Sequence, residues 1–252
     1  MSTPAVLPEA QPWSHDGGPL GALCIHGFTG NPSAMRPVAE AFAAAGFSVE
    51  LPRLPGHGTT VEDMMTTGWP DWTAEAEAAY QRLAARCEQV VVAGLSMGGA
   101  LTLWLAEQHP EIVGLVCINP ATMALGDEVL DMVRGMVDEG TLHLPAVGND
   151  IAKPGVTESA YASTPLPPLL SLMAGLDSLQ AAMATTSTPL LLLNSPQDHV
   201  VEPAQGDHLA GAWGGPVERV MLEQSYHVAT LDHDDELICE LAVAFAQRVA
   251  TR

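Results

Sequence analysis

Basic side chains are scarce in this sequence. Lysine and arginine together number nine against thirty aspartates and glutamates, and Lys153 is the only lysine. The formal charge of −21 therefore reflects missing bases rather than an unusual load of carboxylates. A surface of this sign repels phosphate backbones and anionic lipid headgroups, which argues against nucleic-acid binding and electrostatic membrane docking. The expected partner is a neutral or weakly polar small molecule, and no protein partner is implied.

Cysteine is sparse as well. The sequence contains four scattered cysteines, which are Cys24, Cys87, Cys117 and Cys239. They form neither a CxxC pair nor a Cys/His spacing that binds zinc. Neither a disulfide framework nor a metal site is expected. The first basic residue is Arg36, so the charged start of a secretory signal is lacking. Glycines interrupt the apolar stretch 90–106, which argues against a membrane span there. We expect a cytoplasmic protein with no stable membrane insertion.

Strand-like apolar runs and helical patterns alternate along the 252 residues. The runs are continuous, which is typical of strands whose two faces are both covered. Strand-like runs cover 21–25, 47–51, 90–93, 112–118, 190–193 and 217–222, and helical patterns cover about 33–45, 71–86, 98–108, 203–212 and 234–249. The alternation predicts an α/β fold, with one domain over residues 1–252 built on a doubly wound, mainly parallel sheet.

One interval breaks this alternation. Residues 120–188 contain no strong strand-like run and are too many for a plain connection in a compact sheet. Leucines and methionines at helical spacing after Pro168 indicate a helix in the second half. We therefore expect the interval to be a small helical cap over the carboxyl end of the sheet. Its methionines suit an irregular acyl pocket and ordinary core packing equally well, so both interpretations stay open.

The sequence Gly94-Leu95-Ser96-Met97-Gly98 lies between a strand-like run and a helical pattern. This is the context of a nucleophile elbow, in which small neighbours let a strained turn present the serine hydroxyl outward. The following helix begins beside the serine, and its free N–H groups favour negative charge on a substrate oxygen. Ser96 is therefore the candidate nucleophile.

A serine that transfers acyl groups needs a base and a carboxylate that orients the base. Asp198 follows the run 190–193 and His227 follows the last run, which gives the order Ser, Asp, His expected of such a fold. We interpret Ser96, Asp198 and His227 as a catalytic triad. The sequence also offers competing acids and bases, which are Asp207, Asp232, Asp234, His199, His208 and His233. Positions in or at the start of predicted helices weaken Asp207, His208, His233 and Asp234, and a place directly beside Asp198 weakens His199. Asp232 stays open as an alternative acid.

An oxyanion hole requires two backbone N–H groups near the serine. Met97 directly follows the serine, and Phe28 lies in the loop after an early strand, so these two are the expected donors. We interpret His26 as a structural loop residue rather than a second base. The segment 55–59 is expected to be a turn that packs beneath the site.

Five segments resemble the bacterial monoacylglycerol lipases of Bacillus type and the related small carboxylesterases. They are 26–30 (HGFTG), 54–59 (LPGHGT), 94–99 (GLSMGG), 197–201 (QDHVV) and 225–232 (SYHVATLD). Many hydrolases share the triad motifs, whereas the last block, 225–232, is shared by a much narrower group of proteins. The resemblance extends from about residue 20 to the end of the chain, except for 123–144, where the cap sequence differs. That departure leaves substrate size open.

The resemblance implies the α/β-hydrolase fold, with the cap inserted after the sixth core strand region. It also implies a cofactor-free serine hydrolase that cleaves monoacylglycerols and medium-chain esters, with Ser96, Asp198 and His227 as its triad and Phe28 and Met97 as its oxyanion donors. A cap glutamate binds the glycerol hydroxyls in that family, and Glu158 is the matching position.

Two other readings of the sequence remain. A carboxylesterase of broad specificity would share the same catalytic residues without a preference for glycerol. A ligand-binding module would keep the fold without turnover, and the complete set of candidate residues argues against it. Relatives that use an aspartate nucleophile are disfavoured because the elbow carries Ser96.

Overall fold

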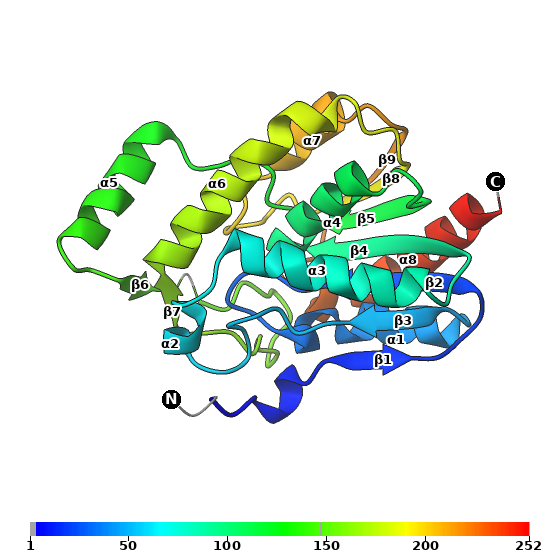
Figure 1. The fold of residues 1–252 in the computed structure, drawn as a ribbon, viewed down its shortest axis with the longest axis horizontal. Helices are drawn as coiled ribbons and strands as arrows, with labels where there is room; N and C mark the ends of the chain where they lie inside the picture. The colour runs from blue at the N-terminus through cyan, green and yellow to red at the C-terminus, as the bar shows by residue number, and fades with distance from the viewer. Residues whose placement is uncertain (1–3, 147, 252) are drawn as a thin grey trace.

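A seven-stranded sheet forms the centre of the molecule (Figure 1). The computed structural model describes residues 4–146 and 148–251. In spatial order its strands are β1 (Trp13–His15), β3 (Ser48–Leu51), β2 (Leu20–Ile25), β4 (Gln89–Leu95), β5 (Gly114–Ile118), β8 (Leu190–Asn194) and β9 (Val217–Met221). In this sheet every neighbouring pair of strands is parallel except β1 with β3. The loops that follow the parallel strands therefore meet along one edge of the sheet, where ligands of open α/β sheets bind.

Helices cover both faces of the sheet (Figure 1). One layer contains α1 (Arg36–Ala44) and α8 (Asp235–Ala250), which pack against each other. The other contains α3 (Trp69–Ala84), α4 (Met97–Gln108) and α7 (Ala204–Ala212). Short helical segments are α2 (Val61–Met64), η1 (Pro8–Ala10), η2 (Pro32–Met35) and η3 (Ala229–Leu231). Within the described ranges, no helix has both the length and the apolarity needed to cross a lipid bilayer.

The predicted doubly wound, mainly parallel sheet is confirmed. The central strands β4, β5 and β8 are almost entirely buried, which is why their sequences are continuously apolar. The edge strand β9 is only half-buried because one of its sides has no neighbouring strand. Sequence reasoning missed β1 and α2, which contain three and four residues and are too short to show a period.

Residues 120–188, which we call the insertion, leave the sheet after β5 and return at β8. The insertion contains α5 (Asp127–Asp138), β6 (His143–Pro145), β7 (Ser163–Pro165) and α6 (Leu166–Met183). The helix predicted after Pro168 is present as α6, which packs on α3 and α4. Met173 and Met183 are buried in this contact, so core packing accounts for these two methionines.

Besides the helices α5 and α6, the insertion contains a two-stranded antiparallel sheet formed by β6 and β7. The expected place of the insertion in the chain was wrong. The insertion follows the fifth sheet strand along the chain rather than the sixth, because only the short β1 precedes β2. α5 has a mostly exposed surface, with only Leu130 and Val133 buried, and it lies at the far end of the molecule in Figure 1.

Candidate active site

Ser96 lies in a tight turn between β4 and α4. Its φ of 57° falls in the left-handed region, which is strained for a residue with a side chain. The turn is held by the Ser96 N–H, which donates to the Ile118 carbonyl at 3.0 Å, and by the Ser96 carbonyl, which accepts from Ala121 at 3.1 Å. Neighbouring strand β5 and the residues after it therefore fix the position of the serine.

The two glycines of the elbow are required by close backbone contacts. A Cβ on Gly94 would collide with the Gly98 carbonyl, and a Cβ on Gly98 would collide with the Ile25 carbonyl at the end of β2. These contacts explain why small residues flank the serine on both sides. They also bring the loop after β2 directly against Ser96.

Asp198 and His227 meet at the ends of the two adjacent strands β8 and β9. Asp198 Oδ2 lies 2.7 Å from His227 Nδ1, and both side chains are buried. The other oxygen, Asp198 Oδ1, accepts the N–H groups of Val200 and Val201 at 2.8 Å each. The carboxylate is thus fully engaged and fixes the imidazole orientation, which leaves Nε2 as the ring atom available for proton transfer.

The main chain of His227 is held by two side chains that the sequence did not single out. Asn119 Nδ2 donates to the His227 carbonyl at 2.9 Å, and Asp150 Oδ2 accepts the His227 N–H at 3.0 Å. Asn119 follows β5 and has a φ of 42°, and its Oδ1 also accepts the Ser195 N–H in the loop after β8. The position of Asn119 directly after a predicted strand could have indicated it as a site residue. No local sequence pattern indicated Asp150.

Phe28 lies in the loop after β2, and Met97 directly follows Ser96 in the first turn of α4. Among the residues that the structure describes, neither backbone N–H has a hydrogen-bond acceptor. Thr29 has a φ of 62°, and its carbonyl accepts the Tyr161 N–H of the insertion at 3.2 Å, which fixes this loop. Two free N–H groups beside a serine can stabilise an oxyanion.

His26 and His57 lie beneath this loop and are completely buried. His26 Nε2 accepts the Leu54 N–H and its Nδ1 contacts the Gly27 carbonyl, so both of its ring nitrogens have structural partners. His57 Nδ1 lies 2.9 Å from the Pro55 carbonyl, and its Nε2 has no partner in the described structure. Burial lowers the pKa of His57 to about 4, so this ring is neutral at physiological pH.

Glu158 extends from the insertion toward the Phe28 loop. Its carboxylate lies against Gly30, where a Cβ would meet Oε1 at 2.7 Å. No donor from the described residues bonds this carboxylate, whereas the Glu158 N–H is fixed by Asn149 Oδ1 at 2.8 Å. Burial raises the pKa of Glu158 above its ordinary value, and the nearby His227 partly opposes that rise. A half-buried carboxylate without a partner can accept hydrogen bonds from a ligand.

The competing acids and bases have other partners. Asp207 and His208 lie on α7 and bond Arg219 and Gln180. Asp232 accepts four backbone N–H groups and Asp234 bonds Gln224 and Ser225, so both stabilise loops. His199 pairs with Asp150 at 2.7 Å and is largely exposed. His233 is an exposed residue before α8.

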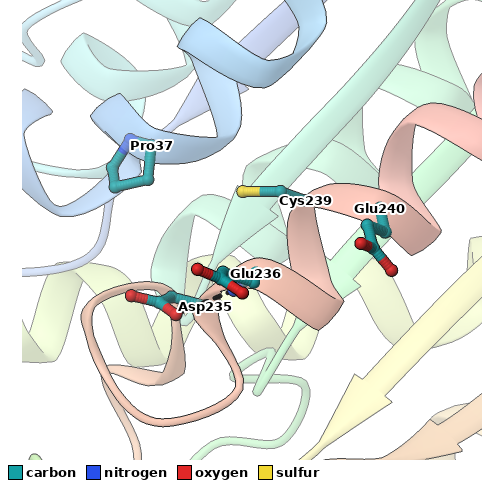
Figure 2. A pocket seen from close by; sticks show the side chains of 5 residues that line it. All are labelled: Pro37, Asp235, Glu236, Cys239 and Glu240. Carbon is teal, nitrogen blue, oxygen red and sulfur yellow. Dashed lines mark hydrogen bonds between the residues drawn. The ribbon is translucent and has the colours of Figure 1, made fainter.

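A hollow of about 340 Å³ lies away from these residues, between α1 and the start of α8 (Figure 2). It is lined by Pro37, Asp235, Glu236, Cys239 and Glu240. Burial and the neighbouring carboxylates raise the pKa of Cys239 to about 11, so its thiol stays protonated.

In the part of the chain that the structure describes, no group of three His, Cys, Asp or Glu residues is arranged to hold a metal ion.

Comparison with known proteins gives a consistent result. The model of the alpha/beta hydrolase family matches residues 22–240. A thermostable monoacylglycerol lipase of Bacillus sp. (strain H-257) is 44% identical over 95% of both chains. A carboxylesterase of Bacillus subtilis (strain 168) is 23% identical over 95% of this chain and 97% of that protein. A solved structure of a metagenome-derived lipolytic enzyme superposes with a TM-score of 0.92, at 41% identity over 97% of this chain and 100% of the other.

Proposed function

The chain belongs to the alpha/beta hydrolase family and is a carboxylic ester hydrolase, and we propose that it cleaves monoacylglycerols to fatty acid and glycerol through an acyl-enzyme on Ser96. The observation that carries this proposal is the contact of 2.7 Å between Asp198 and His227, set at the same sheet edge as the strained Ser96 turn. A carboxylate, an oriented imidazole and an outward serine are the groups that acyl transfer requires.

In the proposed cycle, Ser96 Oγ attacks the ester carbonyl while His227 Nε2 takes the hydroxyl proton. The amides of Phe28 and Met97 stabilise the oxyanion of the tetrahedral intermediate. His227 then gives the proton to the departing glycerol oxygen, which leaves an acyl group on Ser96. Water attacks this acyl group with His227 again as the base, and the fatty acid leaves as the proton returns to Ser96.

We propose further that the insertion is a cap over the carboxyl edge of the sheet, within one domain that comprises residues 1–252. Tyr161 supports this assignment because its hydroxyl donates to the Gly56 carbonyl at 2.7 Å and accepts the Thr59 N–H at 3.0 Å. Asn31 Nδ2 likewise donates to the Ser159 carbonyl at 2.6 Å. These contacts tie the second half of the insertion to the loops beside Ser96.

Glu158 is the proposed residue that recognises the alcohol part of the substrate. Its unpartnered carboxylate and its closeness to His227 support a role in binding glycerol hydroxyls as the ester bond is cleaved. A neutral, hydroxyl-bearing alcohol also suits a protein with a formal charge of −21 better than an anionic one.

The mechanism is tested with Ser96→Ala, measured by ester hydrolysis and by covalent labelling with an alkyl phosphonate probe followed by mass spectrometry. We expect kcat/KM to fall by at least about a thousandfold and the label to disappear, because the covalent route is removed. Ser14→Ala changes an exposed serine on β1 and serves as the control. A labelled site other than Ser96, or near-normal turnover in the variant, contradicts the mechanism.

The substrate preference is tested with Glu158→Gln and Glu158→Ala on a monoacylglycerol and on the 4-nitrophenyl ester of the same acyl chain. Loss of a charge-assisted hydrogen bond should lower kcat/KM for the monoacylglycerol by about ten- to a hundredfold and leave the aryl ester almost unchanged. Glu139→Gln, an exposed change in the insertion, is the control. Equal loss on both esters, or no loss on either, would favour a carboxylesterase of broad specificity.

A further inference from the structure

Asp150 is a buried aspartate in the insertion that the proposed cycle does not use. It lies between β6 and β7 and is 8% exposed. The main chain around it is fixed without its side chain: the Asp150 carbonyl accepts the Val228 N–H at 3.1 Å, and the next residue, Ile151, is buried in the core. Ala152 donates its N–H to Asp232 at 2.7 Å. Removing the Asp150 carboxylate therefore leaves this segment anchored.

The Asp150 carboxylate joins the two loops that carry the proposed acid and base. Oδ2 accepts the His227 N–H at 3.0 Å and the His199 N–H at 3.1 Å. Oδ1 lies 2.7 Å from His199 Nδ1. Because His199 directly follows Asp198, one side chain of the insertion holds the Asp198 loop and the His227 loop at a fixed separation.

This separation determines how the Asp198 and His227 side chains meet. A buried carboxylate that accepts two backbone donors from different loops limits the movement of each loop relative to the other. Misplacement of a reacting group by about 1 Å can reduce a rate by about a hundredfold. The insertion thus contributes to the geometry of the base as well as to any contacts with substrate.

We propose that Asp150 is a positioning residue, which acts through the backbone of His227 and His199 to hold the imidazole of His227 in line with Ser96. This proposal rests on the proposed function of Ser96 and His227. Asp150 donates no proton and touches no substrate in this role. Loss of the Asp150 carboxylate should therefore lower kcat and leave KM almost unchanged.

Asp150→Ala and Asp150→Asn separate the hydrogen bonds from the charge. An asparagine can place its oxygen where Oδ2 accepts the two backbone N–H groups and turn its amide nitrogen toward His199 Nδ1, which can act as an acceptor. The alanine removes all three contacts. We therefore expect kcat to fall by about ten- to a hundredfold in Asp150→Ala with KM almost unchanged, and to stay within about threefold of normal in Asp150→Asn.

Asp234→Ala is the matched control. Asp234 is also buried and also fixes the segment before His227, through the Gln224 N–H at 3.0 Å and the Ser225 hydroxyl at 2.8 Å, but it does not bond His227 or the Asp198 loop. We expect it to lower the temperature of unfolding while kcat stays within about threefold of normal. A proton NMR spectrum of each variant adds a direct readout, because the strongly deshielded proton between Asp198 and His227 should weaken only in Asp150→Ala.

Hydrolysis of one 4-nitrophenyl ester by all three variants and by Ser96→Ala decides the question. A normal kcat in Asp150→Ala overturns the positioning role, as does an Asp150→Asn variant as slow as the alanine variant, or an equal loss of kcat in Asp234→Ala. If Asp150→Ala does not fold, Asp150→Glu, which keeps the charge but lengthens the side chain, should show the same loss of kcat at constant KM. Full activity in Ser96→Ala would instead overturn the proposed function itself.

Discussion

Acid should destabilise this protein partly through one buried histidine, His57. Its ring is completely buried beneath the Phe28 loop, against the rings of Trp72 and Phe28, and its Nε2 has no partner among the described residues. Burial lowers the pKa of His57 from 6.5 to about 4. The proton therefore binds the unfolded chain much more readily than the folded one.

The sign and size of the effect follow from this difference. Above pH 6.5 the ring is neutral in both states and has no effect on stability, whereas between pH 6.5 and about 4 only the unfolded state takes up the proton. One pKa unit corresponds to about 1.4 kcal/mol, so lowering the pH from 7 to 5 should reduce the free energy of unfolding by about 2 kcal/mol through His57.

The assay is urea unfolding at pH 7 and pH 5, for the natural sequence and for His57→Gln. Glutamine cannot take up a proton, so the loss of unfolding free energy between the two pH values should be smaller in the variant by about 2 kcal/mol. His233→Gln, which changes an exposed histidine, should leave that loss unchanged. An equal loss in His57→Gln and in the natural sequence would refute the reasoning, because it would mean that the folded protein tolerates the charged ring.

Two further outcomes concern the site. Asp198→Asn should lower kcat severely, because the amide misorients His227. Asp207→Asn changes only an exposed partner of Arg219 and should have a mild effect on kcat. A severe loss of kcat in Asp207→Asn would mean that the acid is misassigned. Phe28→Leu should retain most of the esterase activity and Phe28→Pro should abolish it, because only proline removes the backbone N–H that is proposed to stabilise the oxyanion. Equal rates in the two variants would show that this N–H does not act in the reaction.

The features around Ser96 could be predicted because they are local. A continuous apolar run, two glycines and a helical pattern are adjacent in the chain, and the contacts of Gly94 and Gly98 explain why both positions need glycine. The buried strands β4, β5 and β8 could be predicted equally well, because a strand covered on both faces must be apolar throughout. The exposed helix α5 and the short β6 and β7 were missed because few of their residues face the core.

The sequence by itself determined the sheet, the elbow and the order in which Ser96, Asp198 and His227 occur. Only the tertiary structure decided which acid meets which base, because Asp198 and His227 come together through the pairing of β8 with β9. It alone disclosed Asp150, which bonds residues 49 and 77 positions further along the chain. The physical reason is that a buried carboxylate is stabilised by backbone N–H groups, which every residue except proline carries, so its partners leave no trace in the sequence.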